Sequence, residues 1–202
     1  MENGKKQAII NVAKELFVQY GFKNVTMDEI ARKAGISKKT IYQYFKDKKD
    51  LVREIIIYEL NRAKQQVDEI LNRKDLNSLD KTIKVHELIL SVKRRQPPMV
   101  VHDLERQYPD LLEEVKKFSH QQIKQAIIDN LEQGKKQGLI RADLNSEIIA
   151  QLQINRYEAL KLNQPFVENY SIETVLKEIL KYHLYGITSE KGRKYIENLK
   201  IF

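Results

Sequence analysis

The stretch KKTIYQY, residues 38–44, combines polar and aromatic side chains at helical spacing. At 100° per residue, Ile41 and Phe45 share one side of a helix, and Thr40 lies at the edge of the other. The opposite half carries Lys38, Lys39, Tyr42 and Gln43. A helix with so few apolar residues has a whole face free to contact another molecule.

The side chains on this face suit the edges and backbone of duplex DNA. Lysines can neutralise phosphates or donate to guanine O6 and N7, and Gln43 can form two hydrogen bonds with adenine. Thr40 can contact a thymine methyl group or a phosphate, and the hydroxyls of Tyr42 and Tyr44 can donate to the DNA backbone. A solvated polar face on a small helix is the alternative interpretation.

Two short helices position this face. Thr26 followed by Glu29 forms a capping box, which predicts that a helix begins there. Gly35 predicts the end of that helix, and Ser37 can cap the next one, which we expect to cover about 38–45. The pattern predicts a helix-turn-helix, although many helical hairpins share it.

Further signals outline the flanking helices. An apolar face predicts a first helix over about 5–20, and Gly21 suits its left-handed cap. Asp47 can cap a long helix reaching about residue 73, and Lys48 in its first turn flanks the groove as a phosphate contact, as does Thr26. Helical periodicity continues to the C-terminus, with 7 glycines and 4 prolines in 202 residues. We therefore expect an all-α protein of about nine or ten helices.

The segment GFKNVTMDEIARKAGISKKTIYQYFKDKKDLV, residues 21–52, resembles the DNA-binding domain of the TetR family of bacterial transcriptional regulators. The matching positions are Gly21, Thr26, Ile30, Ala31, Ala34, Gly35, Ser37, Thr40, Tyr42, Tyr44, Phe45, Lys48 and Leu51. Gln43 departs from the family, which often has a second aromatic residue there.

The resemblance implies two domains. Residues 1–46 would form a three-helix DNA-binding domain with its helix-turn-helix at about 26–45, and residues 47–202 a helical domain for effector binding and dimerisation. It also implies which side chains face DNA: Thr26, Lys38, Lys39, Thr40, Tyr42, Gln43, Tyr44 and Lys48.

Net charge is consistent with a polyanionic partner for the N-terminal part. The chain carries +8 in total. Residues 1–55 hold 12 basic against 7 acidic residues (12 − 7 = +5), and the remainder holds 24 against 21 (24 − 21 = +3). The chain has no cysteine, no apolar segment long enough to span a bilayer and no signal peptide, so we expect a cytoplasmic protein without membrane contact.

Two late apolar stripes are candidates for a dimer interface. By the family resemblance they would pair with a second subunit in a four-helix bundle, although such stripes more often form internal core. The candidate interface residues are Ile148, Leu152, Ile172, Val175, Leu176, Ile179, Leu180 and Leu184.

An effector pocket is expected between the helices of the C-terminal domain. Residues that combine apolar bulk with hydrogen-bonding tips could line it, although each is also suited to ordinary core: Tyr58, His86, Leu90, Met99, His102, Phe118 and Tyr157. The four histidines at 86, 102, 120 and 183 lack metal-ligand spacing, and no nucleophile motif or phosphate loop occurs. We therefore expect no metal, no cofactor and no enzymatic activity.

Together these features predict a homodimeric regulator that binds a palindromic operator and represses until a small-molecule effector releases it. Two alternatives stay open. One is an architectural or ligand-independent DNA-binding dimer without small-molecule input. The other is an activator, because groove contacts do not encode where the operator lies.

Overall fold

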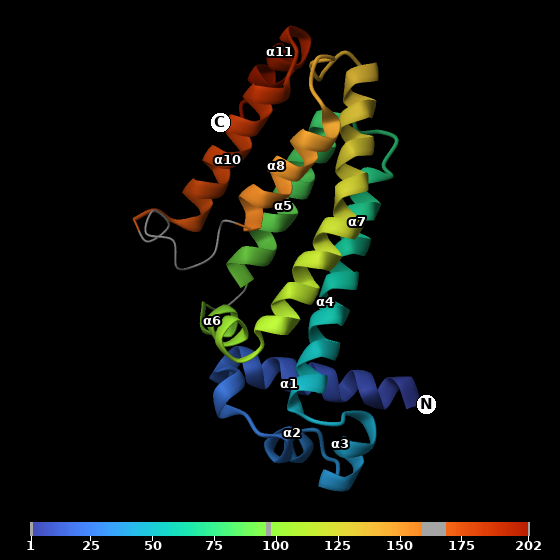
Figure 1. Ribbon diagram of the computed structural model, residues 1–202, viewed down its shortest axis with the longest axis vertical. Helices are drawn as coiled ribbons and strands as arrows, with labels where there is room; N and C mark the ends of the chain where they lie inside the picture. Colours follow the sequence, from blue (N-terminus) through green and yellow to red (C-terminus); the bar gives the residue numbers. More distant parts are fainter. Residues whose placement is uncertain (1, 96–97, 159–168, 202) are drawn as a thin grey trace. The chain divides into compact units, whose positions relative to one another are not determined.

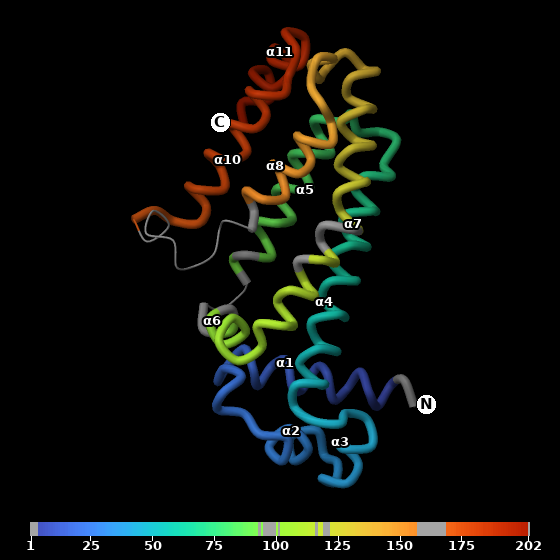
Figure 2. The backbone as a smooth tube through the Cα atoms, viewed as in Figure 1, coloured from blue at the N-terminus to red at the C-terminus, as the bar shows by residue number. Residues whose placement is uncertain are grey.

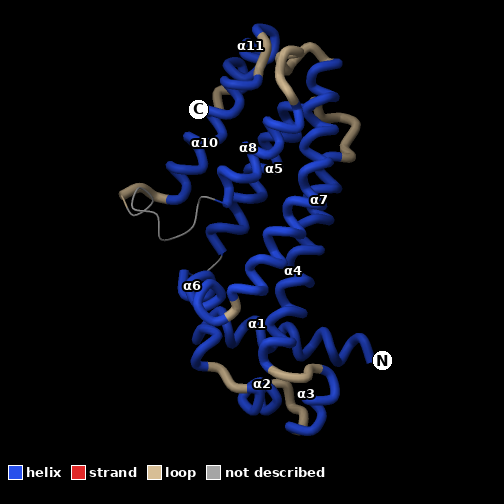
Figure 3. Tube along the Cα trace, viewed as in Figure 1, coloured by secondary structure: helices blue, strands red, loops and turns tan. Residues whose placement is uncertain are grey.

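The computed structural model describes residues 2–95, 98–158 and 169–201. In these ranges the chain is helical and contains no strand (Figures 1 and 3). The helices are α1 (Glu2–Asn24), α2 (Met27–Lys33), α3 (Lys38–Tyr44), α4 (Lys48–Leu71), α5 (Ser78–Arg95), α6 (Pro98–Gln107), α7 (Pro109–Lys136), α8 (Ser146–Glu158), α10 (Ile172–Ile187) and α11 (Glu190–Leu199). The all-α prediction is confirmed. No helix in the described ranges has an apolar stretch long enough to cross a membrane.

The chain forms two compact units, each built from two stretches of sequence. The first comprises Met1–Ala63 with Gln96–Lys116, and the second Lys64–Arg95 with Lys117–Phe202. The long helices α4 and α7 contribute residues to both units. Figure 2 shows the course of the chain by residue number. Whether function divides at residue 46 stays a prediction.

The core of the first unit is an apolar cluster from α1, α2, α3, the start of α4 and the α6–α7 junction. Within it, the Phe17 and Phe22 rings are tilted with centroids 4.9 Å apart, and Tyr108 meets Phe22 edge-on at 5.8 Å. The Lys23 backbone N–H also donates to the Asp103 carboxylate at 3.2 Å. These contacts fasten α6 to the far end of α1.

Gly21 breaks α1 as its sequence position predicts. Its φ of 77° and ψ of 164° are not helical, so α1 is kinked there. An L-residue with a side chain rarely adopts this φ, which explains why glycine stands at this position.

The second unit has its core between α5, α7, α8, α10 and α11, around Leu79, Leu131, Leu184 and Ile196. A short antiparallel bridge between Ile140 and Thr188 joins the loop after α7 to the loop after α10. The Ser189 N–H donates to the Leu139 carbonyl at 3.0 Å in the same place. Gly192 in α11 packs directly on that carbonyl.

A glycine turn ends α7, and an asparagine cap starts α8. Gly138 has a φ of 69°, and Leu139 and Ile140 are buried behind it. Asn145 caps α8 by accepting from the N–H of Ile148 at 3.1 Å. The hydroxyl of Ser146, the first residue of α8, donates to Glu132 at 2.5 Å.

We expect Gly192→Ala to lower the stability of the protein by about 1–3 kcal/mol, because overpacking a close contact costs this much. The new Cβ would lie far inside van der Waals contact with the Leu139 carbonyl oxygen, which the bridge holds in place. Urea unfolding monitored by circular dichroism gives the measurement.

Gly186→Ala is the matched control. Gly186 lies in α10, and a Cβ there meets nothing within 4 Å, so this variant should be as stable as the parent or more so. Equal stability of the two variants would contradict the close packing of α11 on the loop.

Candidate nucleic-acid interface

A capping box starts α2. The Thr26 hydroxyl accepts from the Glu29 N–H at 3.2 Å, and the Glu29 carboxylate accepts from the Thr26 N–H at 2.7 Å. Acceptance from the Thr26 backbone holds the pKa of Glu29 below its ordinary value. The predicted capping box is confirmed, and it places the exposed Thr26 at the N-terminus of α2.

The turn between α2 and α3 also follows the sequence. Gly35 has a φ of 67°, and the Ile36 N–H returns to the Ala31 carbonyl at 3.0 Å. Ser37 then caps α3, accepting from the Thr40 N–H at 3.0 Å. The turn therefore ends α2 and starts α3 within four residues.

Three residues anchor the seven-residue α3. Ile41 and Phe45 are fully buried in the core of the first unit, and Tyr44 packs against that core while half-exposed. The prediction that Ile41 and Phe45 share one side of the helix is confirmed.

The opposite side of α3 faces solvent. Lys38, Lys39 and Gln43 are exposed, and Tyr42 is 44% exposed despite its ring. Thr40 is half-buried, and its hydroxyl lies 2.8 Å from that of Ser37. The structure thus brings the predicted contact residues of α3 onto one continuous surface.

Lys38 has a partner on α2. Its ammonium lies 3.0 Å from the Asp28 carboxylate, and this hydrogen bond raises the pKa of Lys38. Both side chains are exposed, so the pair adds little to stability and Lys38 can readily exchange Asp28 for another anion.

Lys48 is placed differently from the simple phosphate contact that its sequence position predicts. Its ammonium donates to the Phe22 carbonyl and lies 5.9 Å from the Phe17 ring centroid. Burial lowers the pKa of Lys48. The residue therefore ties α4 to the end of α1, and the remaining N–H donors can still reach a phosphate.

No local signal in the sequence reveals this tie, because Phe22 and Lys48 are 26 residues apart. Two ion pairs of the first unit are equally hidden. Lys49 pairs with Asp110 at 2.7 Å, and Arg53 pairs with Glu114 at 2.9 Å. All three contacts hold the start of α4 in place beneath α3.

The short helices, the glycine turn and the exposed polar face define a helix-turn-helix domain. Residues 9–55 match the model of the bacterial regulatory proteins, tetR family. This match agrees with the family resemblance of residues 21–52.

Curated relatives match in the same region. The HTH-type transcriptional regulator YhgD of Bacillus subtilis (strain 168) is 39% identical over 71 residues, which cover 35% of this chain and 37% of the relative. AcrR of Shigella flexneri is 46% identical over 58 residues, which cover 29% of this chain and 26% of the relative. The chain thus matches only about a third of the length of these relatives.

Solved structures extend the likeness in fold to most of the chain. A transcriptional regulator from Cytophaga hutchinsonii ATCC 33406 superposes with a TM-score of 0.73 at 23% identity, over 92% of this chain and 100% of that one. The fatty acid degradation regulator FadR from Bacillus halodurans superposes with a TM-score of 0.68 at 18% identity, over 89% of this chain and 94% of that one. At these identities the likeness concerns the fold alone.

The residues predicted to line an effector pocket fall in both units. Tyr58 and His102 are exposed in the first unit, and His86, Leu90 and Phe118 belong to the second. His86 is buried, whereas Leu90 and Phe118 are partly buried. The side chains of Met99 and Tyr157 lie outside the part of the structure that is described.

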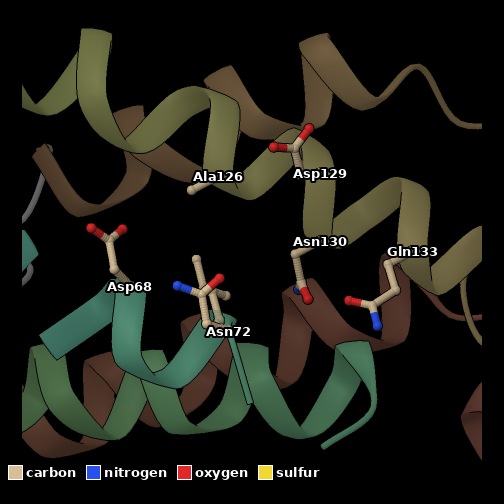
Figure 4. A pocket seen from close by; sticks show the side chains of 7 residues that line it. Asp68, Asn72, Ala126, Asp129, Asn130 and Gln133 are labelled. Carbon is tan, nitrogen blue, oxygen red and sulfur yellow. The ribbon is translucent and has the colours of Figure 1, made fainter. Parts of the chain in front are cut away.

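A polar cavity of about 280 Å³ lies between α4 and α7 in the second unit (Figure 4). None of the predicted pocket residues lines it; its lining is Asp68, Leu71, Asn72, Ala126, Asp129, Asn130 and Gln133. Most of the polar groups are already engaged within the chain. Lys64 pairs with Asp68 at 2.5 Å, and Lys81 donates to Gln133 at 3.0 Å. The cavity is therefore lined mainly by polar groups that already have partners.

The candidate dimer residues separate into two groups. Ile148 and Leu152 on α8 are 58% and 53% exposed. On α10, Ile172 and Ile179 are partly buried, and the other four are packed into the chain's own core: Val175, Leu176, Leu180 and Leu184. Those four are therefore not accessible to a second subunit in this structure.

Substitutions at Lys48 and Lys39 should separate effects on stability from effects on DNA affinity. We expect Lys48→Met to lower the melting temperature, because the bond to the Phe22 carbonyl is lost, and to weaken binding to all DNA sequences alike. Lys39→Met should leave the melting temperature unchanged. It should reduce the slope of log affinity against log salt by about 0.9, the value for one phosphate contact.

Thermal unfolding and fluorescence anisotropy at several salt concentrations provide these readouts. An unchanged melting temperature in Lys48→Met would remove the structural role assigned to this residue.

Proposed function

We propose that this protein is a dimeric transcriptional regulator that binds a palindromic DNA operator through α3 and acts as a repressor. The observation that carries the proposal is the solvent-facing side of α3, where lysine, tyrosine and glutamine side chains lie on a helix whose other side is buried. Such a helix fits the major groove of B-DNA, where base edges are distinguishable.

The proposed contacts follow from the position of each side chain. Lys39 and Lys48 contact phosphates, as does Thr26 at the N-terminus of α2. Gln43 reads a base, and Tyr42 packs its ring on the backbone sugars. Lys38 exchanges Asp28 for a phosphate or a guanine when DNA binds.

The helical second unit supports the regulatory half of the proposal. A small-molecule effector bound there would favour a dimer geometry in which the two copies of α3 no longer match major grooves about 34–36 Å apart. A coupling of about 1–3 kcal/mol is enough for 5–150-fold release.

Selection of binding sites from random duplex DNA is the experiment that tests the proposal. We expect a palindromic consensus, bound by two copies of the chain in the presence of excess random competitor. Tyr42→Ala should lose this binding while remaining folded. Binding that competitor abolishes for every selected sequence would favour an architectural protein instead.

Gln43→Ala should relax the preference for one base pair per half-site by about 1–3 kcal/mol and leave the other positions unchanged. Competition between the selected site and single-base variants measures this effect. The matched control is Lys39→Met, which should weaken binding to all DNA sequences equally. An equal loss of affinity for all these sites in Gln43→Ala would indicate that Gln43 contacts the DNA backbone and not a base.

We further propose that the dimer forms through the exposed apolar side chains of α8 and α10. Ile148 and Leu152 lie one turn apart on α8, and Tyr182 on α10 is 77% exposed. A charge at the centre of such a surface opposes association, because it would be buried without a partner.

Leu152→Asp should therefore shift the protein from dimer to monomer and lower operator affinity at least tenfold, as measured by analytical ultracentrifugation and anisotropy. Leu199→Asp is the control, since Leu199 is an exposed leucine on α11, outside this surface. A Leu152→Asp variant that remains a dimer would place the interface elsewhere.

A further inference from the structure

Two histidines and an arginine meet inside the second unit, between α5, α8 and α10. His86 comes from α5, Arg156 from α8 and His183 from α10 (Figure 1). Both histidines are buried, with 4% and 7% of their surface exposed. Helix α10 otherwise buries aliphatic side chains, so this polar group stands out in its surroundings.

The hydrogen bond between Arg156 and His183 determines the tautomer of the histidine. The Nη2 of Arg156 lies 2.7 Å from Nδ1 of His183. A guanidinium carries donors only, so Nδ1 must accept. A neutral His183 ring therefore carries its proton on Nε2, which becomes a donor.

His183 is neutral throughout the physiological pH range. Burial, followed by the charge of Arg156, lowers the pKa of His183 to about 3. The same two causes lower the pKa of His86 to about 4, opposed by a hydrogen bond from His86 to the backbone of Leu176. Besides burial, the groups that act on the pKa of His183 are Arg156 from α8 and His86 from α5.

The Nε2 of His183 is buried and has no acceptor within the described part of the chain. A buried donor without an acceptor destabilises a folded protein, so such groups are rare and need a reason. The Nε2–H of His183 is thus directed at a position suited to an acceptor, close to a cationic side chain.

A small apolar cluster adjoins the polar group through His86. Leu90 of α5 packs with Ile172, Val175, Leu176 and Ile179 of α10 in a small cluster of their own. The hydrogen bond from His86 to the backbone of Leu176 joins this cluster to the polar group. An acceptor with an attached hydrocarbon part therefore suits the site better than a small inorganic anion.

We propose that this cluster is a binding site for the carboxylate of an amphipathic small molecule. His183 donates from Nε2 to one carboxylate oxygen, Arg156 supplies the complementary charge, and the hydrocarbon part packs against Leu90 and its neighbours. The inference rests on the proposed function in one respect: binding at this site is the event that releases DNA.

Octanoate is the probe, with octanol and octylammonium as controls of equal chain length. We expect octanoate alone to raise the melting temperature and to bind measurably by calorimetry. In spectra of ¹⁵N-labelled protein, His183 should appear as the Nε2–H tautomer, and its Nε2 resonance should shift when octanoate binds.

Two variants isolate the donor. In His183→Asn, the side-chain oxygen can replace Nδ1 as the acceptor for Arg156, but no donor remains at the position of Nε2. In His183→Gln, the terminal amide places N–H groups close to that position. We expect at least a tenfold loss of octanoate affinity in His183→Asn and at most a threefold loss in His183→Gln.

The inference is overturned if octanoate does not bind the parent protein, as when a buried water satisfies Nε2. It is also overturned if octanol or octylammonium binds as well as octanoate, or if His183→Asn keeps the parent's affinity. The proposed function fails separately, if the ligand-free protein selects no DNA sequence. Octanoate that binds at His183 without weakening DNA binding would assign the site but disprove its role in release.

Discussion

The burial of Ile41 and Phe45 beneath α3 is the contact on which the DNA-binding surface depends. A seven-residue helix is too short to persist by itself in water, because its nucleation cost is not recovered over so few residues. These two side chains fasten it to the core of the first unit. Because they occupy only one side of the helix, the other side can be entirely polar.

The core around Ile41 and Phe45 is held together by contacts between residues that are distant in sequence. The start of α4 is tied to α1 through Lys48 and to α7 through Lys49 and Arg53. Aromatic contacts among Phe17, Phe22 and Tyr108 join α1 to the α6–α7 junction in the same unit. A movement of α6 or of the start of α7 would therefore disturb the core on which α3 rests. This gives the proposed release of DNA a physical route within the first unit.

In the second unit, the cluster at His183 contrasts with the cavity between α4 and α7. The cavity is open and polar, and most of its polar side chains bind residues outside its lining. The cluster is buried, contains a cation and directs an N–H donor that has no acceptor in the described chain. Cavity size alone would favour the first site. The state of the hydrogen bonds favours the second.

Local sequence signals were enough to predict the elements of the helix-turn-helix domain. Caps and turns depend on residues within a few positions of one another, so the Thr26–Glu29 box, the Gly35 turn and the Ser37 cap could be read directly. The inner position of Ile41 and Phe45 follows from helical periodicity in the same way. The contact residues proposed on α3 were found because they occupy the other half of that period.

The tertiary structure is needed to distinguish internal from exposed apolar stripes. It is also needed to show which polar side chains contact one another. Periodicity shows that one face of α10 is apolar, but it cannot tell core from interface, and α10 uses Leu176 and Leu184 for the chain's own core. The meeting of His86, Arg156 and His183 joins three helices whose residues are 27 or more positions apart. Their shared burial, neutral rings and unsatisfied donor arise from packing, for which a single sequence carries no local signal.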